Sequence, residues 1–328
     1  MPLKALGLAA LFLIAGQTVD PGDALRKSFE RKASNNVDAI VEQNSPGGSG
    51  SMRLRLWRDS MGRRRTEVLY PLAMQGRIFV DDGTTWKTYF PDSKTIRLHP
   101  SPFLEPDDLD FRMALIRRNY RLEVDEKTTV AGRQAIRLVA HPLRSADLPA
   151  QRFYLDASTF TPLKVETVDD LGNVSVQFVV RKISYPGRLD KNVFDLNAPD
   201  GARVDKGHPP TPVQSWSDIE SRIGFRPAMP RRLPLGFRVR GRSDLLDWRD
   251  VTPLATKVTD GLVRLSVFQF KLGGQAPRPP KPGGEPQVGK TIGDIRVEVR
   301  GEAPVAVRER ILAQFVDILS KRTGAEVP

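Results

Sequence analysis

The strongest constraint on the fold is an alternation of apolar and polar residues that recurs between residues 53 and 184. In the stretch RLRLW, for example, Leu54 and Leu56 alternate with arginines. Because successive side chains of a strand point to opposite faces of a sheet, this period of two predicts strands with one buried face. Turn signals separate the strands, among them Asp82-Gly83 between Val80 and Trp86. The pattern therefore predicts a long antiparallel meander.

Two segments interrupt or precede this meander with helical spacing. DPGDALRKSFERKA, which starts at Asp20, predicts a short helix with Asp23 as its N-cap. DDLDFRMALIRRN (107–119) begins with acidic and ends with basic residues, an order that suits the helix dipole. We therefore expect an α+β protein, in which a curved antiparallel half-open β-barrel is plugged by helices.

The first 18 residues are interpreted as a signal peptide. MPLKALGLAALFLIAG carries one basic residue, Lys4, and then an apolar run that is too short to span a bilayer. This pattern favours export to the periplasm or beyond, although no clean A-x-A cleavage site follows. A buried N-terminal helix and a short uncleaved anchor are the alternatives.

Composition changes again after the meander. The stretch VDKGHPPTPVQ (204–214) is rich in proline and predicts a linker between a domain at 22–203 and a domain at 215–328. The second domain is expected to be smaller and also α+β. It combines short strands with a helix at SWSDIESRIG and a final helix, whose apolar stripe is Ile311, Leu312, Phe315, Ile318 and Leu319.

One motif suggests nucleotide binding and has to be tested against its surroundings. GEPQVGKT (284–291) fits the spacing G-x-x-x-x-G-K-T of a P-loop. A working P-loop needs a buried strand before it and a helix after it, because the helix N-terminus holds the phosphates. Here prolines precede the motif, and Ile295, Val297 and Val299 alternate after it. We therefore predict a surface loop that leads into a strand, without nucleotide.

Residues for catalysis or metal binding are sparse. The histidines His99, His141 and His208 each precede a proline, so we expect them at strand ends and in the linker. The chain contains no cysteine, which excludes a disulfide framework and a thiolate zinc site. The paired acids Asp81-Asp82 and Asp107-Asp108 suit a turn and a helix start. We predict no enzyme, no cofactor and no metal, and leave open an envelope hydrolase with two buried carboxylates.

The formal net charge of +12 restricts the partners. A basic chain suits nucleic acid, an anionic membrane surface or an acidic partner. The densest basic stretch, residues 53–67, has the alternation of a hairpin with a solvated face, and no recognition motif accompanies it. We therefore predict no nucleic-acid binding and leave contact with an anionic membrane surface open.

One face of the predicted meander is apolar. It is expected to carry large apolar residues that include Ile78, Val80, Ile96, Leu98 and Val176. A plain packed core explains this face, and so does a cavity for an acyl chain, because ligand cavities are mostly apolar. On the cavity interpretation the candidate binding residues are Leu54, Leu56, Val68, Trp86, Phe90, Leu138, Phe153 and Phe178.

A family resemblance favours the cavity. IFVDDGTTWKTYFPDSKTIRLHP (78–100) resembles the strand–turn–strand signature of the LolA-like lipoprotein-sorting proteins and of the RseB/MucB sigma-E regulatory proteins, with Asp82, Gly83, Trp86, Tyr89 and Pro91 close to register. YLDASTFTPLKVETVDDLGNVSVQFVVRKISY and NVFDLNAPDGA are similar to its later half, so the resemblance covers about residues 24–203. GFRPAMPRRLPLGFRV (224–239) resembles the opening of the smaller domain that RseB-like proteins add.

This resemblance implies an exported bacterial protein with a half-open barrel over a lipophilic cavity. It also implies a C-terminal domain that touches a membrane-bound regulator, which is the periplasmic part of an anti-sigma factor. We therefore expect a non-enzymatic binding protein for an acyl chain or a lipoprotein, acting in an envelope stress pathway. The alternative is a periplasmic carrier of lipoproteins or lipids.

Overall fold

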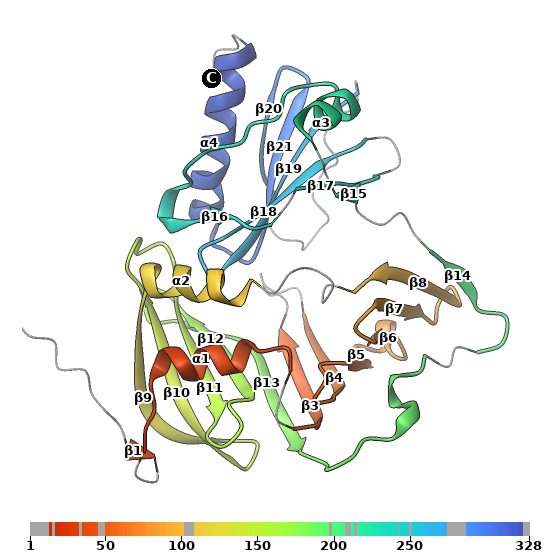
Figure 1. The fold of residues 1–328 in the computed structure, drawn as a ribbon, viewed down its shortest axis with the longest axis vertical. Coiled ribbons are helices and arrows are strands. Elements are labelled where there is room, and N and C mark those ends of the chain that lie inside the picture. Colours follow the sequence, from red (N-terminus) through yellow and green to blue (C-terminus); the bar gives the residue numbers. More distant parts are fainter. Residues whose placement is uncertain are drawn as a thin grey trace, which may run out of the picture.

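The protein is α+β and is built on two sheets (Figure 1). The computed structural model describes residues 13–14, 17–32, 35–44, 50–101, 108–196, 199–206, 211–212, 215–241, 243–248, 251–273 and 287–323. The predicted signal peptide lies outside the described residues, except for the backbone of β1 (Leu13–Ile14) and β2 (Gln17–Thr18). No helix in the described part of the chain is long and apolar enough to cross a membrane.

The first sheet is the predicted meander. Twelve strands lie in the order β14-β8-β7-β6-β5-β4-β3-β13-β12-β11-β10-β9. All neighbours are antiparallel except β14 and β8, and the curved sheet stays open. The strands are β3 (Val37–Asn44), β4 (Ser51–Arg58), β5 (Arg64–Tyr70), β6 (Ile78–Asp81), β7 (Thr85–Phe90), β8 (Thr95–Pro100), β9 (Tyr120–Val130), β10 (Arg133–Pro142), β11 (Ala150–Asp156), β12 (Pro162–Val168), β13 (Val174–Ser184) and β14 (Arg203–Asp205).

Two helices cover part of the concave face, as Figure 1 shows. They are α1 (Pro21–Phe29) and α2 (Leu109–Asn119), and they bury Leu25 and Ile116 against apolar residues of β10 to β12. Asp20, not Asp23, caps α1, because its carboxylate accepts a hydrogen bond from the backbone N–H of Asp23 at 2.8 Å. The predicted cap was wrong by one turn: Asp23 lies inside the first turn, behind Pro21.

The pairing register corrects one part of the predicted apolar face. Asp81 pairs with Trp86 across the Asp82-Gly83 turn, and Val80 pairs with Lys87. Val80 therefore points to the opposite face of the sheet from Trp86. Val80 is buried on the convex face against Trp57 and Phe194. The same alternation places Ile78, Ile96 and Leu98 on the convex face. The prediction was wrong here because alternation gives two faces and does not say which of them is concave.

The second sheet has seven strands, and the last helix packs on it. The strands are β15 (Thr211–Pro212), β16 (Arg238–Val239), β17 (Asp244–Leu245), β18 (Leu254–Thr259), β19 (Arg264–Lys271), β20 (Val288–Ile292) and β21 (Ile295–Gly301). The helices are α3 (Trp216–Ile223) and α4 (Val305–Thr323), with single turns at η2 (Leu72–Met74), η4 (Lys191–Phe194) and η5 (Pro234–Gly236). Buried residues of the predicted α4 stripe, such as Phe315, meet β19 and β21. The predicted linker at 204–214 lies partly outside the described residues.

The P-loop prediction is settled by strand β20. Gly289 and Lys290 of the motif lie inside this strand, and Gly289 pairs with Glu298 of β21. A strand in place of a helix leaves no helix N-terminus to hold phosphates. The expected strand is therefore confirmed, and the expected loop before it lies outside the described residues. His99 and His141 lie in β8 and β10 near their ends, and His208 lies outside the described residues.

Helix α2 also joins the two sheets. At its end Asn119 donates hydrogen bonds to the backbone carbonyls of Asp260 (2.8 Å) and Gly236 (3.2 Å). The next residue, Tyr120, donates its hydroxyl to the Asp260 carboxylate at 2.6 Å. Gly261 sits so close that a Cβ there would lie 2.9 Å from the backbone nitrogen of Ile116. The joint is therefore buried, polar and tightly packed.

Replacing Gly261 by alanine should strain this joint. The residue has φ +111°, where side chains are disfavoured, and its added Cβ would overlap Ile116. Strain and overpacking together should lower the free energy of unfolding by about 2–5 kcal/mol. Gly83→Ala is the control, because Gly83 has φ +91° but nothing within 4 Å of its added Cβ. Thermal and urea unfolding should show the larger loss for Gly261→Ala. Equal losses would mean that the close approach is unimportant.

Candidate ligand-binding cavity

A cavity of about 740 Å³ lies against the uncovered part of the concave face. Its walls are β3, β4, β5, β11, β12 and β13 of the first sheet, together with the end of α1. Residues 301–305 and Arg308, between β21 and the first turn of α4, complete the wall from the second sheet. This volume falls within the range of pockets that bind small molecules. The two sheets therefore share one cavity.

The cavity extends along strands β3 and β4. At one end Val37 pairs with Arg58, which in turn pairs with Arg64. At the other end Asn44 donates its side-chain amide to the carbonyl of Val176 at 2.8 Å. Seven residue steps at about 3.3 Å each separate these ends, which gives about 23 Å. The cavity has the length of an extended chain molecule.

Its middle section is apolar. The lining side chains there come from five strands and α1, and they are Phe29, Val41, Leu54, Leu56, Phe153, Val165, Phe178 and Val180. Outside this section, polar residues such as Gln43, Ser175 and Glu302 line the cavity. The cavity thus has an apolar centre with polar groups around it, as ligand pockets commonly have.

The cavity wall at Phe29 is held by a residue that also contacts the second sheet. The Phe29 ring meets Phe153 edge-on at 6.1 Å. The guanidinium of Arg112 in α2 lies 3.3 Å from the centre of the same ring and donates to the carbonyl of Gly261 at 2.9 Å. Burial lowers the pKa of Arg112 to about 9. Phe29, Arg112 and Gly261 thus form a continuous contact from the cavity to the second sheet.

The predicted binding residues divide into two groups. Leu54, Leu56, Phe153 and Phe178 line the cavity. The other four lie on the same sheet face outside the cavity lining: Leu138 is buried under the helices, Val68 is buried beside Leu54, Trp86 packs on Phe79, and Phe90 lies between Arg77 and Arg97. A binding role for all eight stays a prediction.

Sequence reasoning missed several lining residues. Val41 lies in the stretch VDAIVEQ (37–43), where Val37, Ala39 and Val41 at every second position were a usable signal for a strand. Arg58 and Arg64 were counted among the solvated charges of a hairpin, although they share the concave face with Leu56. The contribution of residues 301–305 had no local signal, because it depends on how the two sheets meet.

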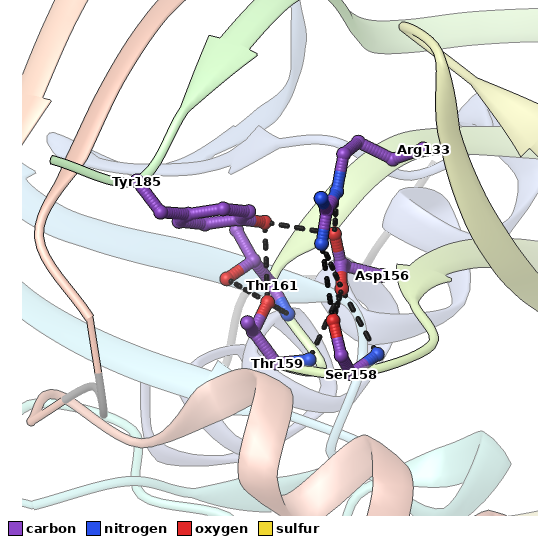
Figure 2. A network of polar contacts seen from close by, with 6 residues as sticks. All are labelled: Arg133, Asp156, Ser158, Thr159, Thr161 and Tyr185. Carbon is purple, nitrogen blue, oxygen red and sulfur yellow. Dashed lines mark hydrogen bonds and ion pairs between the residues drawn. The ribbon is translucent and has the colours of Figure 1, made fainter.

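A buried polar network fixes the cavity wall at the turn between β11 and β12 (Figure 2). The Asp156 carboxylate is buried and accepts hydrogen bonds from Arg133 (2.8 Å), Ser158 (2.7 Å) and Tyr185 (3.0 Å). Despite the opposing effect of burial, the Arg133 guanidinium and the other donors hold the pKa of Asp156 well below its usual range. The adjoining Thr161 lines the cavity. Both oxygens of this carboxylate accept hydrogen bonds from these side chains, so the network is structural.

The arginines at the other wall are different. Burial lowers the pKa of both Arg58 and Arg64, and for Arg58 the neighbouring Arg64 charge lowers it further. Arg64 keeps contact with solvent because it faces the open cavity. Within the described ranges no group of three or more histidine or acidic residues could hold a metal ion.

Comparison with known proteins finds a matching family model and similar structures. Residues 39–197 match the family model described as the MucB/RseB N-terminal domain. The structure is similar to a crystal structure of MucB, with 19% identity, a TM-score of 0.60, and coverage of 90% of this chain and 96% of that chain. No curated protein matches the chain.

Two further similar structures contain a partner. One is MucB in complex with MucA(peri), at 20% identity and a TM-score of 0.62, covering 89% of this chain and 97% of that chain. The other is the MucA/MucB complex of Pseudomonas aeruginosa, at 20% identity and a TM-score of 0.61, covering 90% and 97%. At this identity the likeness shows a shared fold over nearly the whole length of MucB.

The network of Figure 2 predicts a pH-dependent contribution to stability. Asp156→Asn should lower the free energy of unfolding at pH 7 by about 2–4 kcal/mol, because charge-assisted bonds to a buried carboxylate are lost. The folded pKa of Asp156 is depressed, so its contribution is full above the unfolded value of about 3.9 and is lost as pH falls below it. The gap between wild type and variant should therefore narrow on acidification.

Urea unfolding between pH 7 and pH 3 measures this gap. Asp169→Asn is the matched control, because Asp169 also closes a hairpin turn, accepting from the backbone N–H of Asn173, but is fully exposed. We expect little change for the control. A gap for Asp156→Asn that stays constant down to pH 3 would contradict the assignment.

Proposed function

The chain belongs to the MucB/RseB family, and on this premise we propose that it is a non-enzymatic regulatory binding protein of the bacterial periplasm. Its proposed partner is the periplasmic part of a membrane-bound anti-sigma factor. The similar MucB structures with MucA support this proposal, because they share the fold over 97% of the MucB chain. The proposed ligand is an acyl chain that occupies the cavity.

One observation carries the proposal: the cavity wall includes residues 301–305 and Arg308 of the second sheet and α4. A ligand that fills the cavity therefore contacts both parts of the chain at once. A ligand shifts a conformational equilibrium only by its different affinity for the two states. Contact with both parts supplies such a difference if the parts move relative to each other. A carrier of lipoproteins or lipids would use the same cavity without needing this contact.

Acyl-chain binding is tested by a series of neutral primary alcohols of increasing length. Each added methylene that is buried should tighten binding about fourfold, from about 0.8 kcal/mol per CH₂, until the cavity is full. Leu56→Trp should weaken binding, because Leu56 lines the cavity and the larger ring would occupy it. Leu171→Trp is the control, because Leu171 is 82% exposed.

Displacement of a fluorescent acyl probe measures both effects. Binding that does not depend on chain length, or that Leu56→Trp leaves unchanged, would argue against a cavity for acyl chains. A normal circular dichroism spectrum of each variant is the folding control.

Partner binding is tested with the purified periplasmic part of the anti-sigma factor from the same organism. We expect a complex with a dissociation constant of about 1 µM or lower, which a saturating acyl ligand weakens by linkage between the two sites. Isothermal titration calorimetry with and without ligand measures the coupling. A complex whose affinity does not change with the ligand would mean that partner binding and ligand binding are separate functions. Absence of any complex would favour the carrier.

A further inference from the structure

Arg58 and Arg64 occupy a position in the cavity that the proposed acyl chain does not explain. They are direct cross-strand neighbours at the end of the β4–β5 hairpin, and both line the cavity beyond Leu56. Cross-strand neighbours on one face have their Cβ atoms about 5 Å apart, and like charges at such positions destabilise a sheet. The sequence therefore keeps an unfavourable pair of positive charges at one end of an apolar cavity.

Neither guanidinium has a counter-ion bound to it. Among the described residues, no ion pair or hydrogen bond reaches Arg58 or Arg64, and Nε of Arg58 is buried without a partner. Asp81 is the nearest counter-charge, since it pairs with Arg64 across β5 and β6, but it forms no ion pair with it. Two arginines and one carboxylate leave a net positive charge. Tyr185 is the further titratable group near Arg58.

The convex face of the same two strands provides an internal comparison. There Arg53 pairs with Glu42 at 2.9 Å, Arg55 with Asp38 at 3.1 Å, and Arg65 with Glu67 at 2.6 Å. Each of these arginines has a carboxylate partner, whether its side chain is well exposed, as for Arg53 at 57%, or nearly covered, as for Arg65 at 14%. Burial without a partner makes the unpaired state costly for Arg58, whereas Arg64 keeps contact with solvent in the cavity.

We propose that Arg58 and Arg64 bind the anionic group of the cavity ligand, which is then a single-chain anionic amphiphile. This proposal rests on the acyl-binding function proposed above and adds the charge and the orientation of the ligand. The anion is a carboxylate or a phosphate monoester, because a guanidinium fork matches the oxygens of both. The hydrocarbon chain runs from this end along Leu56, Leu54 and Val41 toward the wall formed by residues 301–305.

The length and polarity of the cavity agree with this orientation. The arginine pair lies at the Val37 end of β3, and the apolar section follows it along the strand. An amphiphile whose charge is bound at this end therefore directs its chain toward the second sheet. The anion fixes the depth of the ligand, so chain length determines whether its far end reaches residues 301–305.

The test compares three ligands of equal chain length on the full chain. They are dodecanoate, dodecyl phosphate and dodecanol, each in competition with the same fluorescent acyl probe. The wild type should bind at least one anionic ligand about 10- to 100-fold more tightly than dodecanol, which corresponds to one or two charge-assisted hydrogen bonds. The ratio between dodecanoate and dodecyl phosphate then identifies the anion.

The variants separate charge from fold. Arg58→Gln/Arg64→Gln should lose the preference for the anionic ligand and keep dodecanol binding, which reports an intact cavity. Arg58→Lys/Arg64→Lys should keep part of the preference, because the charge stays while the fork is lost. Arg53→Gln/Arg55→Gln on the convex face is the matched control and should bind all three ligands like the wild type.

The outcomes are distinguishable. Equal binding of anionic and neutral ligands by the wild type, or an unchanged preference in Arg58→Gln/Arg64→Gln, overturns the anion site and leaves the acyl cavity standing. If no ligand of the three binds, the acyl-binding function fails, and the anion site fails with it. If Arg58→Gln/Arg64→Gln does not fold, the wild-type ratio and the lysine variant decide the question.

Discussion

An antiparallel sheet with one apolar face has to bury that face, and the whole molecule is arranged around this requirement. The curved sheet of twelve strands is larger than two short helices can cover. Helices α1 and α2 bury the part formed by β10 to β12, where Leu138 and Leu155 are completely covered. In the described part of the chain no helix covers the part formed by β3, β4 and β13, which the end of α1 and the first turn of α4 only border. The cavity is the uncovered remainder of the face, with the second sheet closing one side.

Helix α2 helps to fix the position in which the second sheet closes the cavity. Asn119, Tyr120 and Asp260 are all buried at the joint, and their hydrogen bonds are directional. Burial raises the pKa of Asp260, because a buried carboxyl is costly to ionise. Such a joint specifies one docking geometry more strictly than an apolar contact would. Because Arg112 holds Phe29 and the carbonyl of Gly261 together, the joint and the cavity share a residue.

The sequence predicted the strands well, because alternation and turn signals are local. Asp82-Gly83 set the β6–β7 hairpin, and the fold class followed from the meander and its interruptions. The faces of β6 and β8 could not be predicted, since the choice between concave and convex depends on register with strands distant in the chain. The same holds for Arg64, whose pattern is that of a solvated hairpin charge until Arg58 and the cavity are placed beside it. Asp260 lies 140 residues after Tyr120 in the chain, and no local sequence signal indicates that the two meet at the joint.

The shared cavity wall also bears on the choice between a regulator and a carrier. A carrier gains most from a cavity whose entrance lies within one rigid part, because loading and release should leave its fold unchanged. Here residues 301–305 belong to the connection between β21 and α4, which are both anchored in the core of the second sheet. A chain that pushes against this connection pushes against that core, and cores resist small displacements. Strain that the cores do not absorb is passed to the joint, where the two parts shift relative to each other once directional hydrogen bonds such as that of Tyr120 to Asp260 are broken. A ligand of sufficient length would therefore be sensed as a change in the relative position of the two sheets.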